Sequence, residues 1–283
     1  MLSSNIQAIL QNHSKLLEAA LNIDSSSARI EVQCLLQTVL KVNRAWLLTH
    51  PEQSLDAGQH ARYMTLLERR LTGEPIAYLL GEREFYGLTF KVSPATLIPR
   101  PETELLVELA LQRIPRQGAC RVLDLGTGSG AIALSIARAR PEAEVVATDA
   151  SMAALELAQF NARQLNLGNV RLLHSDWFGA LQGASFDIIV SNPPYIAAGD
   201  VHLAQGDVRF EPRDALISGS DGLDDIRLVC TQAKIHLRPK GWLIFEHGYD
   251  QAAQVRALLQ QSGFEEIFSA RDLSGIERVS GGI

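Results

Sequence analysis

The segment Asn192-Pro193-Pro194-Tyr195 follows the apolar run of residues 186–191 and carries groups suited to one kind of chemistry. Its two prolines fix φ and lack N–H donors, so the turn presents carbonyl oxygens and the Asn192 side chain as acceptors. Acceptors suit a planar –NH₂ group whose lone pair is delocalised into a ring or a carbonyl, as in a peptide bond. The segment therefore predicts a site for an amide or an amino-substituted base.

Such a nitrogen becomes reactive when acceptors hold both of its hydrogens. Hydrogen bonds to Asn192 Oδ1 and to the Pro193 or Pro194 carbonyl would aim the lone pair at a methyl donor. These bonds would strengthen as positive charge grows on nitrogen. Tyr195 can pack on the planar group and exclude water. The pattern favours amino-group methylation without selecting amide or base, and a rigid Pro-Pro turn is the structural alternative.

A glycine-rich turn lies between the apolar run 122–125 and a helical pattern. Its G-x-G-x-G spacing is neither the G-x-G-x-x-G of dinucleotide folds nor a phosphate loop, because no Lys follows. An acid in this turn would repel a pyrophosphate and suits a cationic ligand such as S-adenosylmethionine; a generic βα turn is the alternative. The residues predicted to contact this cofactor here are Asp124, Gly126, Thr127, Gly128, Ser129 and Gly130.

Two further polar positions follow successive predicted strands. Asp149 ends the second strand, where an acid can accept hydrogen bonds from both hydroxyls of a ribose. Asp176-Trp177 follows the third strand, where a carboxylate can accept from an adenine amino group and an aromatic ring can stack on the base. Trp177 alone would equally suit a plain core position. Together, these positions at the ends of three strands predict a nucleoside site, with Asn192 as a further cofactor contact.

The elements that must position these residues alternate from Arg121 onward. We predict strands at 121–125, 144–148, 170–174, 186–191, 241–247, 264–270 and 276–281, and helices near 130–139, 152–165, 222–236 and 250–261. Continuous apolar runs such as Ile188-Ile189-Val190 indicate strands buried on both faces. The pattern predicts an α/β fold with a doubly wound, largely parallel sheet.

The chain before Arg121 shows a different pattern of residues. Apolar residues at helical spacing predict helices over 5–21, after Asp24, around Trp46 and over about 57–71, which would form a small bundle. Residues 84–92 read as two short strands about a Gly turn. We predict a helical domain over 1–72, a linker with a β-hairpin over 73–98 and a catalytic domain over 99–283.

Charge and composition exclude several classes of protein. The 283 residues carry a net charge of −6, divided into +1 for residues 1–72 (7 Lys and Arg, 6 Asp and Glu) and −7 for the rest (19 and 26). A broad grip on nucleic acid needs the opposite sign, so we expect no direct nucleic-acid binding. No apolar run approaches a membrane span. The three cysteines and seven histidines show no metal-binding spacing, so we expect a metal-free, cytoplasmic monomer.

Beyond single motifs, the whole chain resembles the release factor glutamine methyltransferases (PrmC, also called HemK), which are protein-(glutamine-N5) methyltransferases. The resemblance extends from the helical part to the last strand. It is densest in the cofactor and Asn192–Tyr195 motifs and in four further segments: Gly73–Leu79, Phe85–Leu88, Leu97–Glu104 and Glu211–Leu216 with Asp221–Leu223. Ser218-Gly219-Ser220 is a mild departure, because a more glycine-rich turn is expected there.

This resemblance implies a Rossmann-like class I S-adenosylmethionine-dependent methyltransferase sheet with a small N-terminal helical bundle. It implies methyl transfer to the side-chain amide N5 of the glutamine in the Gly-Gly-Gln motif of peptide-chain release factors, which modulates translation termination. Carried over to this sequence, the 126–130 loop, Asp149, Trp177 and Asn192 contact S-adenosylmethionine, and the Asn192–Tyr195 segment holds the glutamine. The N-terminal bundle would help to dock the release factor.

Other residues near these motifs have two interpretations each. Arg100, Glu102 and Thr103 either order a lid over the site or begin a helix. We interpret the acids Asp221, Asp224 and Asp225 as a solvated helix start. Glu246 and His247 end the fifth strand and could line the pocket, but a structural histidine is the simpler interpretation.

Three rival functions remain open at this stage. A DNA or RNA adenine-N6 methyltransferase shares the acceptor turn but needs a basic groove for a flipped base, and residues 1–72 show no stripe of Arg and Lys. A glutamine methyltransferase of a ribosomal protein would differ only in docking. A binding protein with a vestigial cofactor fold is disfavoured by the intact glycine loop, Asp149 and acceptor turn.

Overall fold

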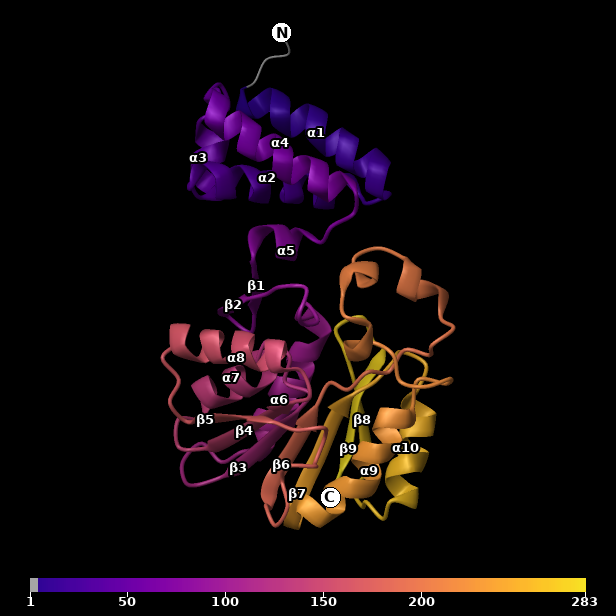
Figure 1. Ribbon diagram of the computed structural model, residues 1–283. Helices are drawn as coiled ribbons and strands as arrows, with labels where there is room; N and C mark the ends of the chain where they lie inside the picture. Colours follow the sequence, from indigo (N-terminus) through magenta and orange to yellow (C-terminus); the bar gives the residue numbers. More distant parts are fainter. Residues whose placement is uncertain (1–4) are drawn as a thin grey trace. The chain divides into compact units, whose positions relative to one another are not determined.

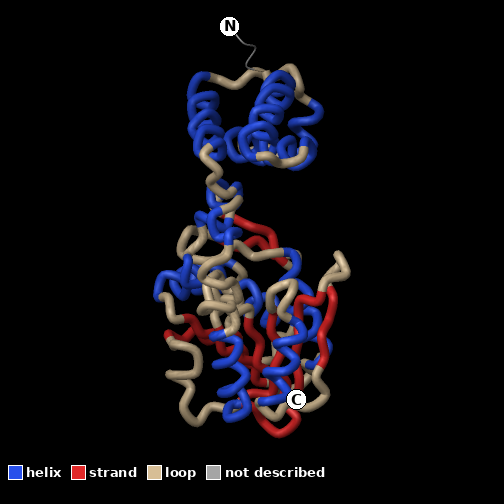
Figure 2. The backbone as a smooth tube through the Cα atoms, turned by 90° about the vertical axis from the view of Figure 1, so that its right-hand side faces the viewer, coloured by secondary structure: helices blue, strands red, loops and turns tan. Residues whose placement is uncertain are grey.

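The computed structural model describes residues 5–283, and the chain divides into two compact units. The first unit ends at Gly81 and also contains Ala204–Phe210; the second comprises Glu82–Leu203 and Glu211–Ile283. The chain therefore leaves the second unit once and returns to it. Helices alone build the first unit, whereas the strands belong to the second (Figures 1 and 2).

The first unit contains five α-helices among its described residues: α1 (Ile6–Leu21), α2 (Ser25–Leu40), α3 (Arg44–Thr49), α4 (Ala57–Leu71) and α5 (Ile76–Leu80). Side chains satisfy the free N–H groups at the helix starts. Asp24 accepts from two backbone N–H groups of α2, and Asp56 forms a reciprocal capping box with Gln59 at α4. Apolar side chains at helical spacing form a separate core, centred on Leu17, Leu35 and Leu67. The four predicted helices are confirmed.

A hairpin opens the second unit. Strand β1 (Glu82–Phe85) pairs with β2 (Leu88–Lys91) in antiparallel register about Tyr86-Gly87, as the sequence predicts. Phe85 and Phe90 are buried in the same hydrophobic core as helix α6 (Glu104–Arg113).

Seven strands form the main sheet in the order β5-β4-β3-β6-β7-β9-β8. Their bounds are β3 (Arg121–Leu125), β4 (Glu144–Asp149), β5 (Val170–His174), β6 (Phe186–Ser191), β7 (Leu237–Glu246), β8 (Phe268–Arg271) and β9 (Glu277–Gly282). The first five pair in parallel, and β9 pairs antiparallel to both β7 and β8. The predicted doubly wound, largely parallel sheet is confirmed.

Helices cover both faces of this sheet (Figure 1). Helices α6, α7 (Ala131–Ala139) and α8 (Met152–Gln164) lie on one face, and α9 (Asp224–His236) and α10 (Ala252–Gln261) on the other. In β6, Ile188 and Val190 belong to the core on the α6, α7 and α8 face, whereas Ile189 belongs to the core on the α9 and α10 face. Alternate side chains of a strand point to opposite faces of the sheet. The chain order reverses between β3 and β6, which opens a crevice at the carboxyl ends of these strands.

In the main sheet, two strand starts differ from prediction by more than one residue. Strand β7 begins at Leu237 and not at residue 241, because Leu237 already pairs with Phe186 of β6. The regular pairing resumes at Trp242 with Ile188, and residues 238–241 lie within a register shift. Lys240 has φ of 65°, and a Cβ at Gly241 would lie 2.9 Å from the Arg238 carbonyl oxygen. Strand β8 begins at Phe268 and not at residue 264.

Candidate active site

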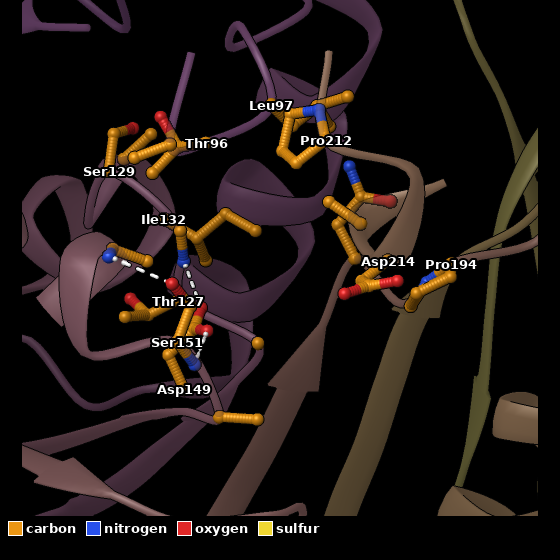
Figure 3. A pocket seen from close by; sticks show the side chains of 18 of the residues that line it. Thr96, Leu97, Thr127, Ser129, Ile132, Asp149, Ser151, Pro194, Pro212 and Asp214 are labelled. Atoms are coloured by element: carbon orange, nitrogen blue, oxygen red, sulfur yellow. Dashed lines mark hydrogen bonds between the residues drawn. The ribbon is translucent and has the colours of Figure 1, made fainter. Parts of the chain in front are cut away.

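A cavity of about 570 Å³ lies in the second unit where β3, β4 and β6 end. Figure 3 shows Thr127, Asp149 and Ser151 gathered on one side of it, with Pro194 and Asp214 across from them. Nine of the residues predicted for the site line this cavity: Gly126, Thr127, Gly128, Ser129, Asp149, Asp176, Trp177, Asn192 and Pro194. Asp124, Gly130, Pro193 and Tyr195 do not line it. The size suits a small-molecule cofactor together with a short side chain.

The glycine loop forms the floor beside β4. Gly126 and Gly128 have φ of 69° and 56°, a region that glycine adopts without strain, and a Cβ at Gly126 would face open space. Asp149 Oδ2 accepts a hydrogen bond from the Gly128 N–H at 2.8 Å, and Oδ1 accepts from the Ser151 N–H at 2.8 Å (Figure 3). One carboxylate thus joins the loop to the start of α8 and keeps lone pairs toward the cavity.

Asp124 is placed differently from the ligand-facing carboxylate that the sequence suggested. Its side chain is fully buried beneath the loop, and Thr127 Oγ1 donates to Oδ2 at 2.6 Å. Burial raises the pKa of the Asp124 carboxyl to about 7, and the nearby Asp149 adds to the rise. We therefore assign Asp124 to the support of the glycine loop.

Strand β5 is followed by a strained turn. Trp177 has φ of 45°, which is unusual for a bulky residue, and its side chain lines the cavity beside Asp176. Ser175 stabilises this turn, because its Oγ donates to the Trp177 carbonyl at 2.8 Å and accepts from the Ala180 N–H at 3.0 Å. The strained backbone therefore belongs to Trp177, the residue whose indole ring lies at the cavity.

The acceptor turn, residues 192–195, directly follows β6. The Asn192 side chain donates through Nδ2 to Thr103 Oγ1 at 3.3 Å, whereas its buried Oδ1 has no hydrogen-bond partner among residues 5–283. In the same range, no N–H donates to the Pro193 or Pro194 carbonyl oxygens. The Tyr195 hydroxyl donates to Glu246 Oε1 at 3.2 Å, away from the cavity. The turn therefore presents unused acceptors.

A glutamine holds this turn from behind. Gln251 Nε2 donates to the Tyr195 carbonyl at 3.0 Å and to the Gly222 carbonyl at 3.3 Å, and its Oε1 accepts from the Gly248 N–H at 2.8 Å. Any Cβ at Gly222 would lie 2.3 Å from the Tyr195 oxygen, so only glycine fits. The Gln251 side-chain amide thus links the backbone at Tyr195, Gly222 and Gly248.

The predicted site omitted several residues that line the cavity wall. They come from two segments remote in sequence, from the start of α8 and from α9: Thr96, Leu97, Pro99, Pro212, Asp214, Ser151 and Asp225. Asp225 contradicts our assignment of a solvated helix start, whereas Asp221 and Asp224 do pair with Arg227 at the surface. Arg100 Nη2 donates to the buried Glu211 at 2.6 Å, which ties the residues before α6 to the Pro212 loop. In the sequence, these loops were indicated only by the resemblance of Leu97–Glu104 and Glu211–Leu216 to the family.

His247 has a structural role. It is fully buried, and its ring nitrogens contact the Gly248 carbonyl and Ser280 Oγ, both at 2.9 Å. Burial lowers its pKa, so the ring stays neutral. Residues 5–283 contain no cluster of side chains positioned to hold a metal ion and no helix long and apolar enough to cross a membrane.

A glycine loop after β3, an acid at the end of β4 and an acceptor turn after β6 define a Rossmann-like methyltransferase. Comparison with solved structures agrees on the fold: a Pyrococcus furiosus methyltransferase has a TM-score of 0.54 at 18% identity, covering 76% of this chain and 95% of that one. The T. thermophilus 16S rRNA N2 G1207 methyltransferase, solved with AdoMet and guanosine, has a TM-score of 0.52 at 27% identity over 71% of this chain and 49% of that one. The "Methyltransferase small domain" family matches residues 102–210.

Sequence relatives define the family. The "PrmC N-terminal domain" model matches residues 8–81. The release factor glutamine methyltransferase of Xylella fastidiosa (strain Temecula1) is 52% identical over 90% of this chain and 92% of its own, and that of Bordetella pertussis is 52% identical over 92% and 96%. The chain belongs to the release factor glutamine methyltransferase family.

Proposed function

We propose that this enzyme transfers a methyl group from S-adenosylmethionine to the side-chain amide N5 of the glutamine in the Gly-Gly-Gln motif of peptide-chain release factors. It acts as a monomer in the cytoplasm, and its first unit docks the release factor without direct contact to nucleic acid. One observation carries the chemical assignment: the Asn192 Oδ1 acceptor is buried at the cavity wall and has no partner among the described residues. A planar carboxamide supplies the missing donor.

The cavity fits the cofactor. S-adenosylmethionine, when bound, supplies an electrophilic methyl group on a sulfonium centre. Gly126 and Gly128 leave an open cradle that a side chain would narrow, Asp149 offers acceptors to ribose hydroxyls, and Trp177 offers a ring face to the adenine. Asp124 holds the cradle in shape through Thr127.

The chain's own contribution to the reaction is to hold the target nitrogen. Asn192 Oδ1 takes one amide hydrogen and the carbonyl of Pro193 or Pro194 takes the other; one of the two leaves as a proton when the nitrogen is methylated. Both acceptors are fixed in place before the substrate arrives, so they stabilise the charge that develops on nitrogen at no cost of reorganisation. Tyr195 supports the turn from behind.

The test supplies purified protein and methyl-labelled S-adenosylmethionine with three acceptors: a release factor, a mixture of ribosomal proteins and duplex DNA. Tandem mass spectrometry should locate the label on the Gly-Gly-Gln glutamine, and a Gly-Gly-Asn release factor should remain unlabelled. Label on a ribosomal protein or on DNA, with none on the release factor, would overturn the proposal.

A further inference from the structure

A buried asparagine on α8 joins β2 to the glycine loop. Asn161 is fully buried and does not line the cavity. Its Nδ2 donates to the Lys91 carbonyl at 3.0 Å and to the Ser129 carbonyl at 2.8 Å, and its Oδ1 accepts from the Lys91 N–H at 2.8 Å. Both amide hydrogens are therefore used, and one side chain connects the last residue of β2 with the loop that follows β3.

The two segments that Asn161 connects form adjoining walls of the cavity. Ser129 lines it from the glycine loop, and residues 95–97 line it shortly after Lys91 in the chain. The walls lie close together, since a Cβ at Gly128 would be 4.0 Å from the Thr96 Cβ. Figure 3 shows Thr96 and Ser129 at the same end of the cavity. Asn161 therefore ties the two walls together from outside the cavity.

Close packing against α8 holds the loop at its next residue as well. A Cβ at Gly130 would lie 3.3 Å from the Ala158 Cβ, which is tighter than an ordinary contact. Ala158 is fully buried and precedes Asn161 by three residues, so both side chains lie on one face of the helix. The same face of α8 thus holds the glycine loop at two successive residues and reaches Lys91 through the Asn161 amide.

We propose that Asn161 is a positioning residue that holds the glycine loop and residues 95–97 at the separation that S-adenosylmethionine requires. The inference rests on the cofactor role in the proposed function and is independent of the methyl acceptor. A wall that is fixed before binding loses less conformational freedom when the cofactor enters, so the affinity is higher. The role needs an amide, because both carbonyls require a donor and a carboxylate has none.

Asn161→Ala removes all three hydrogen bonds. We expect the calorimetric Kd for S-adenosylmethionine to rise about 10-fold or more, because two carbonyls lose their donor and the walls are then ordered only when the cofactor binds. Asn161→Asp keeps the shape and the acceptor for the Lys91 N–H but lacks the donors, so its Kd should rise by a similar factor. At saturating cofactor, kcat on a release factor should stay within about threefold of wild type for both variants.

Asn169→Ala is the matched control, because Asn169 also donates from its side-chain amide to backbone carbonyls. Its Nδ2 lies 3.1 to 3.2 Å from the carbonyl oxygens of Ala137, Arg140 and Ala143, where α7 ends and β4 begins. Asn169 does not line the cavity. The control should lower the urea midpoint of unfolding as Asn161→Ala does, but its Kd for S-adenosylmethionine should match wild type.

A wild-type Kd in Asn161→Ala, or an equal rise of Kd in Asn169→Ala, overturns the inference. If neither Asn161 variant folds, hydrogen exchange of the wild type decides. Saturating S-adenosylmethionine should slow exchange of the Lys91 amide, which donates to Asn161. The Ala143 amide, which donates to the Arg140 carbonyl, should slow less, and equal slowing overturns the inference.

The behaviour of the wild type separates this inference from the proposed function. A wild type that binds S-adenosylmethionine but does not label a release factor refutes the proposed acceptor and leaves the role of Asn161 in place. A wild type that does not bind S-adenosylmethionine refutes the cofactor assignment and this inference with it.

Discussion

Asp149 makes two hydrogen bonds with its own backbone surroundings, accepting from Gly128 and Ser151 at 2.8 Å each, and still faces the cavity. Asp149→Asn should weaken cofactor binding about 10- to 100-fold, because charge-assisted bonds to the loop and to a ribose are replaced by weaker ones. Calorimetric titration with S-adenosylmethionine measures this. At saturating cofactor, kcat should stay near wild type; a variant with wild-type affinity would remove Asp149 from the cofactor site.

Asp124 gives a prediction about stability and pH. Its pKa is raised to about 7 in the folded protein, against an ordinary value of 3.8, so the folded state holds a proton that the unfolded state releases between these values. Folding stability therefore falls as pH rises through this window. Asp124→Asn removes the effect, so wild type should lose about 1.4 kcal/mol per pH unit relative to the variant between pH 5 and 7. Urea unfolding of both proteins across this range measures the slope, and parallel curves would contradict the assignment.

The types of the site residues could be predicted from sequence, but the directions of their side chains could not. Asp124 and Asp149 are both acids at strand ends, yet one is sealed beneath the loop and the other faces the cavity. The sequence offers no pattern that joins Thr103 to Asn192, because that contact spans 89 residues. Its geometry depends on how the 3-10 helix η1 (Pro101–Thr103) packs against the end of β6.

At the scale of elements, periodicity and turn residues predicted the sheet well. The α4 bounds at Ala57 and Leu71 follow from the capping residue Asp56 and the glycine after the helix. The start of β7 was missed, because Arg238–Gly241 has the composition of a loop, whereas Leu237 before it pairs with Phe186 of the neighbouring strand. Tertiary pairing overrode local propensity there.

The side chain of Gln251, the N-cap residue of α10, holds the acceptor turn, which allows a prediction at the scale of elements. Gln251→Ala should lower the free energy of unfolding by about 1–3 kcal/mol, because the Tyr195 and Gly222 carbonyls lose a buried donor. It should also lower kcat, since the turn is no longer fixed. Chemical denaturation and steady-state kinetics measure the two effects.

Gln254→Ala is the control for this variant, because Gln254 lies in the first turn of α10 and is exposed. Its stability and kcat should match wild type. Hydrogen exchange adds a local readout: the amides of Ile196 and Ala198, which bond to the Leu216 and Gly219 carbonyls, should exchange faster in Gln251→Ala. Unchanged exchange and unchanged kcat together would refute a role for Gln251 in holding the turn.

At the scale of the whole molecule, the first unit is more than the N-terminal helices. Ala204–Phe210 belongs to it, and Arg209 Nη2 donates to the Thr72 carbonyl at 2.7 Å. The buried Arg70 pairs with Glu31 through two bonds of 2.7 and 3.0 Å and with Asp207 at 3.4 Å. A short segment from the second half of the sequence thus supplies Asp207, an additional acidic partner for the buried Arg70 of the helical unit.

This arrangement allows the proposed docking role of the first unit to be tested in the full chain. Glu31→Gln should destabilise that unit by about 3 kcal/mol, because the buried Arg70 loses its bidentate partner. At a temperature where only the variant's first unit has melted, KM for a release factor should rise about 10-fold or more, whereas kcat/KM for a short Gly-Gly-Gln peptide should persist. Calorimetry locates the transitions, and Glu68→Gln on the exposed side of α4 is the control. Equal losses on both substrates would show that the first unit supports the catalytic half and does not dock the protein substrate.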